Sequence, residues 1–233
     1  RGDKAEKAKK YLERAMDLDP EHFPTLCQYA QLLCERKAYL PAEEFYARAL
    51  SLDYKGNERL RCSALCNYGV VLQKSRMDFK GSLEIHKVAV KEFPHDVQAL
   101  YACATLTWGF AQKYDEACEL YKRALAVDPD HVMSLLRYGS LLADEYDDLN
   151  VAEQCFQRAT EIDPECPEAL QSYAELLEQR GELEKATVMY DQALMLVPHD
   201  VEIQRACKRM RTDPVILDPN TPQPNVPVPQ QFV

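Results

Sequence analysis

Nine cysteines and five histidines are the residues of this chain that could bind a metal ion or act as nucleophiles. Cys62 and Cys66 are four positions apart, so on a helix they would share one face. Two thiols without a neighbouring histidine or a second cysteine pair are a weak indication of zinc, and the sequence has no C-x-x-C pair. We therefore expect most of the cysteines to be small, reduced, half-buried side chains. We expect no metal and no cofactor.

The histidines are spread along the chain and do not form a cluster in the sequence. Four of them follow recurring prolines, in "DPEH", "FPHD", "DPDH" and "VPHD"; these are His22, His95, His131 and His199. A polar side chain at such a position can bind the free amides that begin a helix, so we interpret these histidines as structural. His86 stands where related segments carry an aromatic residue, and we expect it in the core.

Motifs for catalysis are missing from the sequence. It has no glycine-rich phosphate loop and no G-x-S-x-G, H-E-x-x-H or protein-kinase motif. Its acidic residues recur at helical spacing, which is typical of solvated faces. The sequence therefore predicts a protein that is not an enzyme.

The elements that position these residues are indicated by a repeat in the sequence. Five prolines and one tyrosine mark its units, at spacings of 34, 40, 35, 35 and 34 residues; they are Pro20, Tyr54, Pro94, Pro129, Pro164 and Pro198. Before each mark, a small residue is followed four positions later by a large one and three later by another small one, which places all three on one helix face. The sets are Ala8, Leu12, Ala15; Ala42, Tyr46, Ala49; Ser82, His86, Ala89; Ala117, Tyr121, Ala124; Ala152, Phe156, Ala159; and Ala186, Tyr190, Ala193. A second helix with its own apolar pattern follows each mark, as in Leu26, Tyr29, Ala30 and Leu33.

This pattern resembles the tetratricopeptide repeat family, whose unit is a helix–turn–helix of about 34 residues. The resemblance extends from Asp3 to about Arg211. It implies an all-α fold, a right-handed superhelical solenoid of antiparallel helix pairs. The expected parts are the second helix of a truncated repeat (1–21), repeats at 22–55, 56–95 with a longer preceding loop, 96–130, 131–165 and 166–199, a capping helix (200–211), and an extended proline-rich tail (212–233).

Both ends of the chain depart from the repeat. The first helix of the opening repeat is missing, so we expect the chain to be a fragment of a longer array. Six of the 14 prolines lie between Pro214 and Pro229, which excludes a helix there. That tail is expected to be a linker, a ligand for a proline-binding module, or a segment that docks on its own array.

The resemblance implies that one face of each first helix lines a concave groove in which peptides or partner helices bind. Carried over position by position, the candidate groove residues are Asn67, Tyr101, Thr105, Trp108, Met133, Leu136, Arg137 and Glu175. Aromatic residues and arginine dominate interface energies, and the end of the groove is acidic. A partner with an apolar anchor beside a basic segment would fit. The alternative is that Trp108 and Leu136 only cover the seam between adjacent helices.

Chaperone-binding members of the family hold acidic peptide tails with a lysine, asparagine and arginine clamp. In this chain the clamp positions match only at Asn67 in one register and only at Arg137 in the next. A heat-shock chaperone carboxylate tail is therefore not an expected partner.

Composition and charge exclude further classes of partner. The formal net charge of −10 disfavours general nucleic-acid binding, and no apolar run approaches the roughly 20 residues that span a bilayer. Unpaired cysteines and the missing signal peptide favour an intracellular, most simply cytoplasmic, location. We expect a protein–protein interaction scaffold within a larger assembly. The alternatives are the targeting or regulatory region of a multidomain enzyme and an assembly factor in an RNA–protein complex.

Overall fold

The computed structural model describes residues 2–52 and 54–212, which form twelve α-helices and no strand. The all-α class predicted from the sequence is confirmed. The proline-rich tail lies outside the described residues from position 213 onward. The helices are α1 (Gly2–Leu18), α2 (Phe23–Glu35), α3 (Tyr39–Leu50), α4 (Glu58–Arg76), α5 (Phe79–Glu92), α6 (Val97–Gly109), α7 (Tyr114–Val127), α8 (Val132–Tyr146), α9 (Leu149–Ile162), α10 (Pro167–Gln179), α11 (Leu183–Leu196) and α12 (Val201–Thr212).

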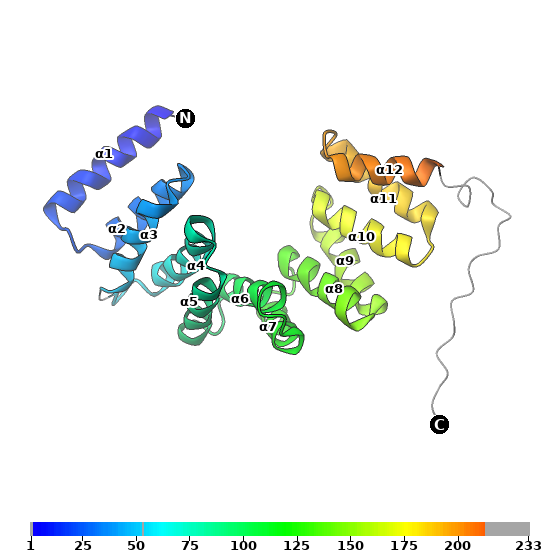
Figure 1. Ribbon diagram of the computed structural model, residues 1–233, viewed down its shortest axis with the longest axis horizontal. Helices are drawn as coiled ribbons and strands as arrows, with labels where there is room; N and C mark the ends of the chain where they lie inside the picture. The colour runs from blue at the N-terminus through cyan, green and yellow to red at the C-terminus, as the bar shows by residue number, and fades with distance from the viewer. Residues whose placement is uncertain (1, 53, 213–233) are drawn as a thin grey trace, which may run out of the picture. The chain divides into compact units, whose positions relative to one another are not determined.

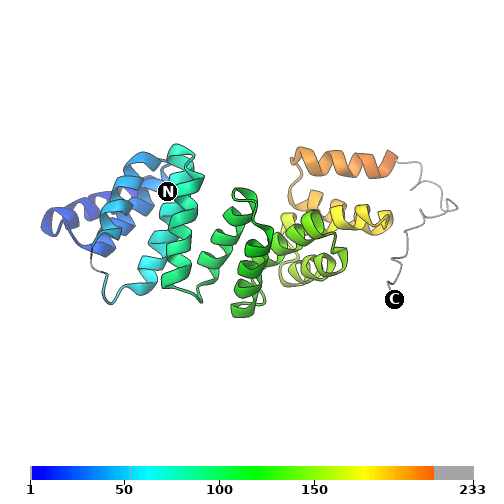
Figure 2. The same cartoon turned by 60° about the horizontal axis from the view of Figure 1, so that its bottom comes forward.

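The helices belong to two compact units, which meet in sequence between Pro129 and Asp130. The first unit holds α1 to α7 and the second holds α8 to α12. Inside each unit, every helix packs against the next one along the chain. The first helices of neighbouring pairs are also in contact; examples are α2 with α4 and α8 with α10. Both views show this clearly for α4 and α5, which lie side by side and antiparallel (Figures 1 and 2).

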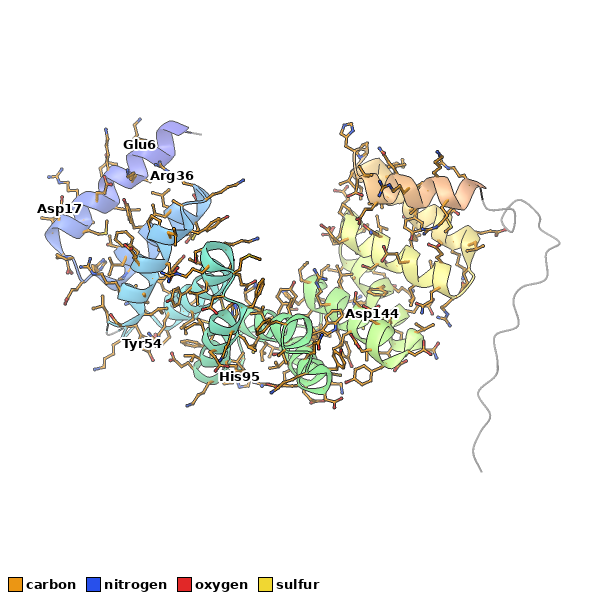
Figure 3. All side chains as sticks on the ribbon, in the orientation of Figure 1. Glu6, Asp17, Arg36, Tyr54, His95 and Asp144 are labelled. Atoms are coloured by element: carbon orange, nitrogen blue, oxygen red, sulfur yellow. The ribbon has the colours of Figure 1, made fainter. Side chains whose placement is uncertain are left out.

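The small–large–small faces form the core, as the sequence predicts. Ala42, Tyr46 and Ala49 of α3 are all buried, and the matching sets of α5, α7, α9 and α11 are buried too. Alanine at a crossing lets two helix backbones approach, and the large ring between the alanines fills the space that remains. The set on α1 differs, because Ala8 is exposed and Leu12 and Ala15 are only half-buried. This helix packs on α2, and Arg36 after α2 holds it through an ion pair with Glu6 of 3.0 Å (Figure 3).

Each turn between the two helices of a pair contains a residue in the left-handed region. These residues are Lys37, Met77, Gln112 and Asp147, with φ between 52° and 60°, and Gly181 with φ 78°. The left-handed conformation costs a residue with a Cβ atom roughly 1–2 kcal/mol. The packing of the two helices on either side must therefore impose the turn at the four positions that lack glycine.

The interpretation of the loop histidines as capping residues holds for only part of the set. His131 caps its helix, because its Nδ1 accepts a hydrogen bond from the Ser134 amide at 3.3 Å. His22 binds the Thr25 hydroxyl at 2.7 Å and makes no side-chain hydrogen bond to a helix amide. The next residue does the capping after His95 and His199. Asp96 accepts from the Ala99 amide at 2.8 Å and Asp200 from the Ile203 amide at 3.0 Å, because a carboxylate is the stronger acceptor.

Arg61 organises the long loop that precedes α4. Its guanidinium donates to both carboxylate oxygens of Glu92 at 2.7 and 3.1 Å and to the Leu50 carbonyl at 3.2 Å. It also lies 4.1 Å from the ring centre of Tyr54, which is labelled in Figure 3. One half-buried cation therefore ties α4 to the end of α5 and to the loop that makes this repeat longer.

Replacing Glu92 by glutamine is expected to lower the free energy of unfolding by about 1–3 kcal/mol at neutral pH. The two hydrogen bonds from Arg61 hold the pKa of Glu92 below its ordinary value. A depressed carboxyl pKa contributes stability above the unfolded value, near 4.3, and that stability is lost as pH falls through the folded value. Urea unfolding followed by circular dichroism at about pH 7 and about pH 3 should thus show a difference that shrinks in acid.

Glu84→Gln is the control for this measurement, because Glu84 pairs with Lys87 on an exposed helix face at 3.0 Å. Such a pair is worth only about 0–1 kcal/mol. An equal loss for Glu92→Gln at both pH values would show that the Arg61 bridge does not act through the charge of Glu92.

Candidate protein-binding surface

In the first unit, the predicted groove residues lie on α4 and α6. Tyr101, Thr105 and Trp108 follow one another at spacings of four and three residues, so they share one face of α6. All three are half-buried, and Asn67 on α4 is exposed. The Asn67 side chain hydrogen-bonds the hydroxyl of buried Tyr46 on α3.

Buried Tyr121 of α7 contacts two side chains of this α6 face. Thr105 Oγ1 donates to the Tyr101 carbonyl at 2.9 Å and lies 3.1 Å from the Tyr121 hydroxyl. A threonine hydroxyl has one hydrogen, so Tyr121 must be the donor in the second bond. The Tyr101 and Tyr121 rings also pack with their centres 6.4 Å apart. The Tyr101 and Thr105 side chains are thus held in place by the core of their own unit.

In the second unit, the predicted residues lie on α8 and α10. Met133 is 40% exposed, and Arg137 and Glu175 are exposed. Leu136 differs, because only 5% of it is exposed. Its side chain therefore offers almost no surface to a partner, and we remove it from the candidate surface. This agrees with the alternative reading in which Leu136 packs between helices.

The negative charge at the acidic end of the second unit is partly neutralised by a cation that the sequence analysis did not place there. Glu178 of α10 accepts hydrogen bonds from the Tyr190 hydroxyl at 3.1 Å and from Arg209 of α12 at 2.6 Å. Glu175 accepts from Gln171 at 2.8 Å. On α8, burial and then the charge of Glu145 raise the pKa of Asp144, which is labelled in Figure 3. The cation from α12 was missed by sequence reasoning, which treated that helix only as a cap.

The sequence also missed a cleft of about 650 Å³ in the first unit. Residues of α5 and α7 form most of its lining, with Cys103 of α6 beside them. Lys87, Lys91 and Arg123 supply positive charge, and two glutamates of α7 supply negative charge.

Comparison with protein families finds tetratricopeptide repeats along the chain. Three models, each described as "Tetratricopeptide repeat", match residues 3–22, 110–145 and 142–210. A search of curated proteins finds no match.

Several solved structures share this fold at low sequence identity. YrrB, described as a TPR protein with an unusual peptide-binding site, is 22% identical with a TM-score of 0.61, over 84% of this chain and 97% of that one. The Cut9–Hcn1 hetero-tetramer of the APC/C gives 12% identity and a TM-score of 0.75, over 89% of this chain and 40% of that one. PilF of Pseudomonas aeruginosa gives 20% identity and a TM-score of 0.71, over 87% of this chain and 88% of that one.

The helix pairs, the alanine and aromatic packing faces and the family matches agree. No described helix has both the length and the apolar character that crossing a membrane requires. The chain belongs to the tetratricopeptide repeat proteins.

Proposed function

We propose that this chain is a non-catalytic scaffold that binds a partner protein through the exposed faces of its first helices. The tetratricopeptide repeat fold binds protein or peptide partners. The observation that carries the proposal is the α6 face, where buried Tyr121 holds Tyr101 and Thr105. Trp108 follows Thr105 on the same face of the helix. A surface that is ordered before binding loses less side-chain entropy when a partner arrives.

Each unit supplies a surface of its own chemistry. The aromatic face of α6 suits an apolar anchor, because tyrosine and tryptophan offer large contact areas with few rotatable bonds. The exposed Glu175 of α10 and Asp144 of α8 suit a basic segment. Met133 and Arg137 add an apolar and a cationic contact on α8. The partner that we propose therefore carries an apolar anchor and a basic stretch.

Trp108→Ala is expected to weaken binding of that partner by about 2 kcal/mol, or roughly 30-fold. The partner would first be captured from cells with the wild-type chain, and its affinity would then be measured with purified proteins. Glu175→Lys should weaken binding as well, with an effect that shrinks at high salt, because the contact is electrostatic.

Tyr11→Ala is the matched control, since it removes an aromatic ring that is 74% exposed on α1, away from the proposed face. Its affinity should equal that of the wild type. Equal affinities for Trp108→Ala and Tyr11→Ala, with both variants folded by circular dichroism, would reject the α6 face as the binding surface.

A further inference from the structure

Two thiols and a carboxylate converge inside the first unit. The sulfur atoms of Cys62 and Cys66 on α4 and a carboxylate oxygen of Asp96 all lie within 4.8 Å of one another. Both cysteines are buried and Asp96 is half-buried. Asp96 also hydrogen-bonds the Cys62 side chain. The stacking of α4 on α5 and α6 brings Asp96 to the two cysteines, which precede it by 34 and 30 positions.

His86 of α5 adjoins the cluster. Its side chain hydrogen-bonds Cys66, and only 1% of it is exposed. Its Nδ1 atom is buried and has no hydrogen-bond partner among the described residues.

Comparison inside the chain shows that packing alone does not require a histidine at position 86. The matching positions of the other helix pairs in α3, α7, α9 and α11 carry Tyr46, Tyr121, Phe156 and Tyr190. His86 lies against Gly69 of its partner helix as Phe156 lies against Gly139. A phenylalanine would occupy the same kind of space. The polar ring of His86 instead gives the Cys66 thiol a hydrogen-bond partner inside the core.

The Asp96 carboxylate is already oriented for binding. One of its oxygens accepts from the Ala99 amide at 2.8 Å and so caps α6. A carboxylate has two oxygens, and hydrogen bonds of this kind fix the direction of metal ligands.

We propose that Cys62, Cys66 and Asp96 form a binding site for a thiophilic divalent cation, with Zn²⁺ as the best match. Zinc binds sulfur, nitrogen and carboxylate oxygen, whereas Mg²⁺ and Ca²⁺ require oxygen ligands. Three protein ligands leave the fourth position of a tetrahedral zinc ion to water. The ion would join α4 to the start of α6, next to the proposed binding face, and the site does not depend on that function.

Cobalt is the spectroscopic probe for the site. The full chain, reduced and freed of metal with a chelator, is titrated with Co²⁺ and then with Zn²⁺. We expect a sulfur-to-cobalt charge-transfer band that saturates at one equivalent and is abolished by Zn²⁺. We also expect Zn²⁺ to raise the Tm, because a ligand that binds the folded state stabilises it.

Three variants test the ligands, and each is chosen to preserve the fold. Cys62→Ala and Cys66→Ala remove one thiol each, and Asp96→Asn keeps a side chain that can cap α6. Each should weaken Zn²⁺ binding at least tenfold in competition with a chromogenic chelator. Cys103→Ala and Cys155→Ala remove buried thiols elsewhere and should bind as the wild type does.

The outcome that overturns the site is a wild-type chain without the charge-transfer band, or a band that persists in Cys62→Ala and Cys66→Ala. Unchanged affinity in folded Asp96→Asn would equally overturn the three-ligand set. Circular dichroism of every metal-free variant separates loss of a ligand from loss of the fold.

Discussion

Replacing Tyr121 by alanine is expected to lower the free energy of unfolding by about 3–5 kcal/mol, the usual cost of deleting a large buried aromatic side chain. The Tyr121 ring is fully buried, and its hydroxyl donates to Thr105 across the α6–α7 pair. The variant leaves a cavity where two helices cross, and it leaves Thr105 without that donor. Urea unfolding followed by far-ultraviolet circular dichroism would measure the loss.

Tyr121→Phe separates the two contributions. It keeps the ring and removes only the hydrogen bond to Thr105, so we expect a loss of about 0.5–1.5 kcal/mol. If both variants lose the same free energy, the ring does not support the helix pair in the way that we describe.

Replacing Gly139 by leucine is expected to cost about 1–3 kcal/mol through overpacking. A Cβ atom at this position of α8 would lie 2.8 Å from Cε1 of Phe156 and 3.2 Å from Cβ of Cys155. Both neighbours are buried in α9, so neither can move into solvent. Leucine is a better helix former than glycine, and the loss would therefore come from the helix crossing. The shift in Tm and in the urea midpoint would report it.

Gly109→Leu is the matched control for Gly139→Leu. A Cβ atom at Gly109 of α6 would meet no atom within 4 Å, so leucine there should leave stability unchanged or raise it by up to about 1 kcal/mol. Similar destabilisation at both positions would show that the close approach of α8 and α9 is not what excludes a side chain.

The fold could be predicted because it depends on a pattern that each helix carries in itself. Alanine and a large residue at spacings of four and three already specify which face of α3 or α11 is buried. The capping residues were predicted less well, since His95 and Asp96 are neighbours in a polar loop and only the backbone geometry decides which one reaches the Ala99 amide.

The candidate surface was harder to predict, because exposure depends on neighbouring helices. The angular position of Leu136 on α8 suggested an exposed side chain, but angle alone does not tell how far other helices cover it. Arg209 reaches Glu178 from a helix 31 residues later in the chain. The cysteine cluster also could not be predicted from the sequence. Cys62 and Cys66 were expected on one face and His86 in the core, yet their contact depends on how three helices stack.

The contacts of this protein are local along the chain, because within each unit the main packing partners are helices one or two apart in sequence order. Such a unit can be lengthened or shortened by a whole helix pair while the remaining pairs keep their own neighbours. Duplication or deletion of one coding segment can therefore alter the length of the surface without redesigning its interior. Evolution can adjust the reach of this scaffold separately from the chemistry of any one pair.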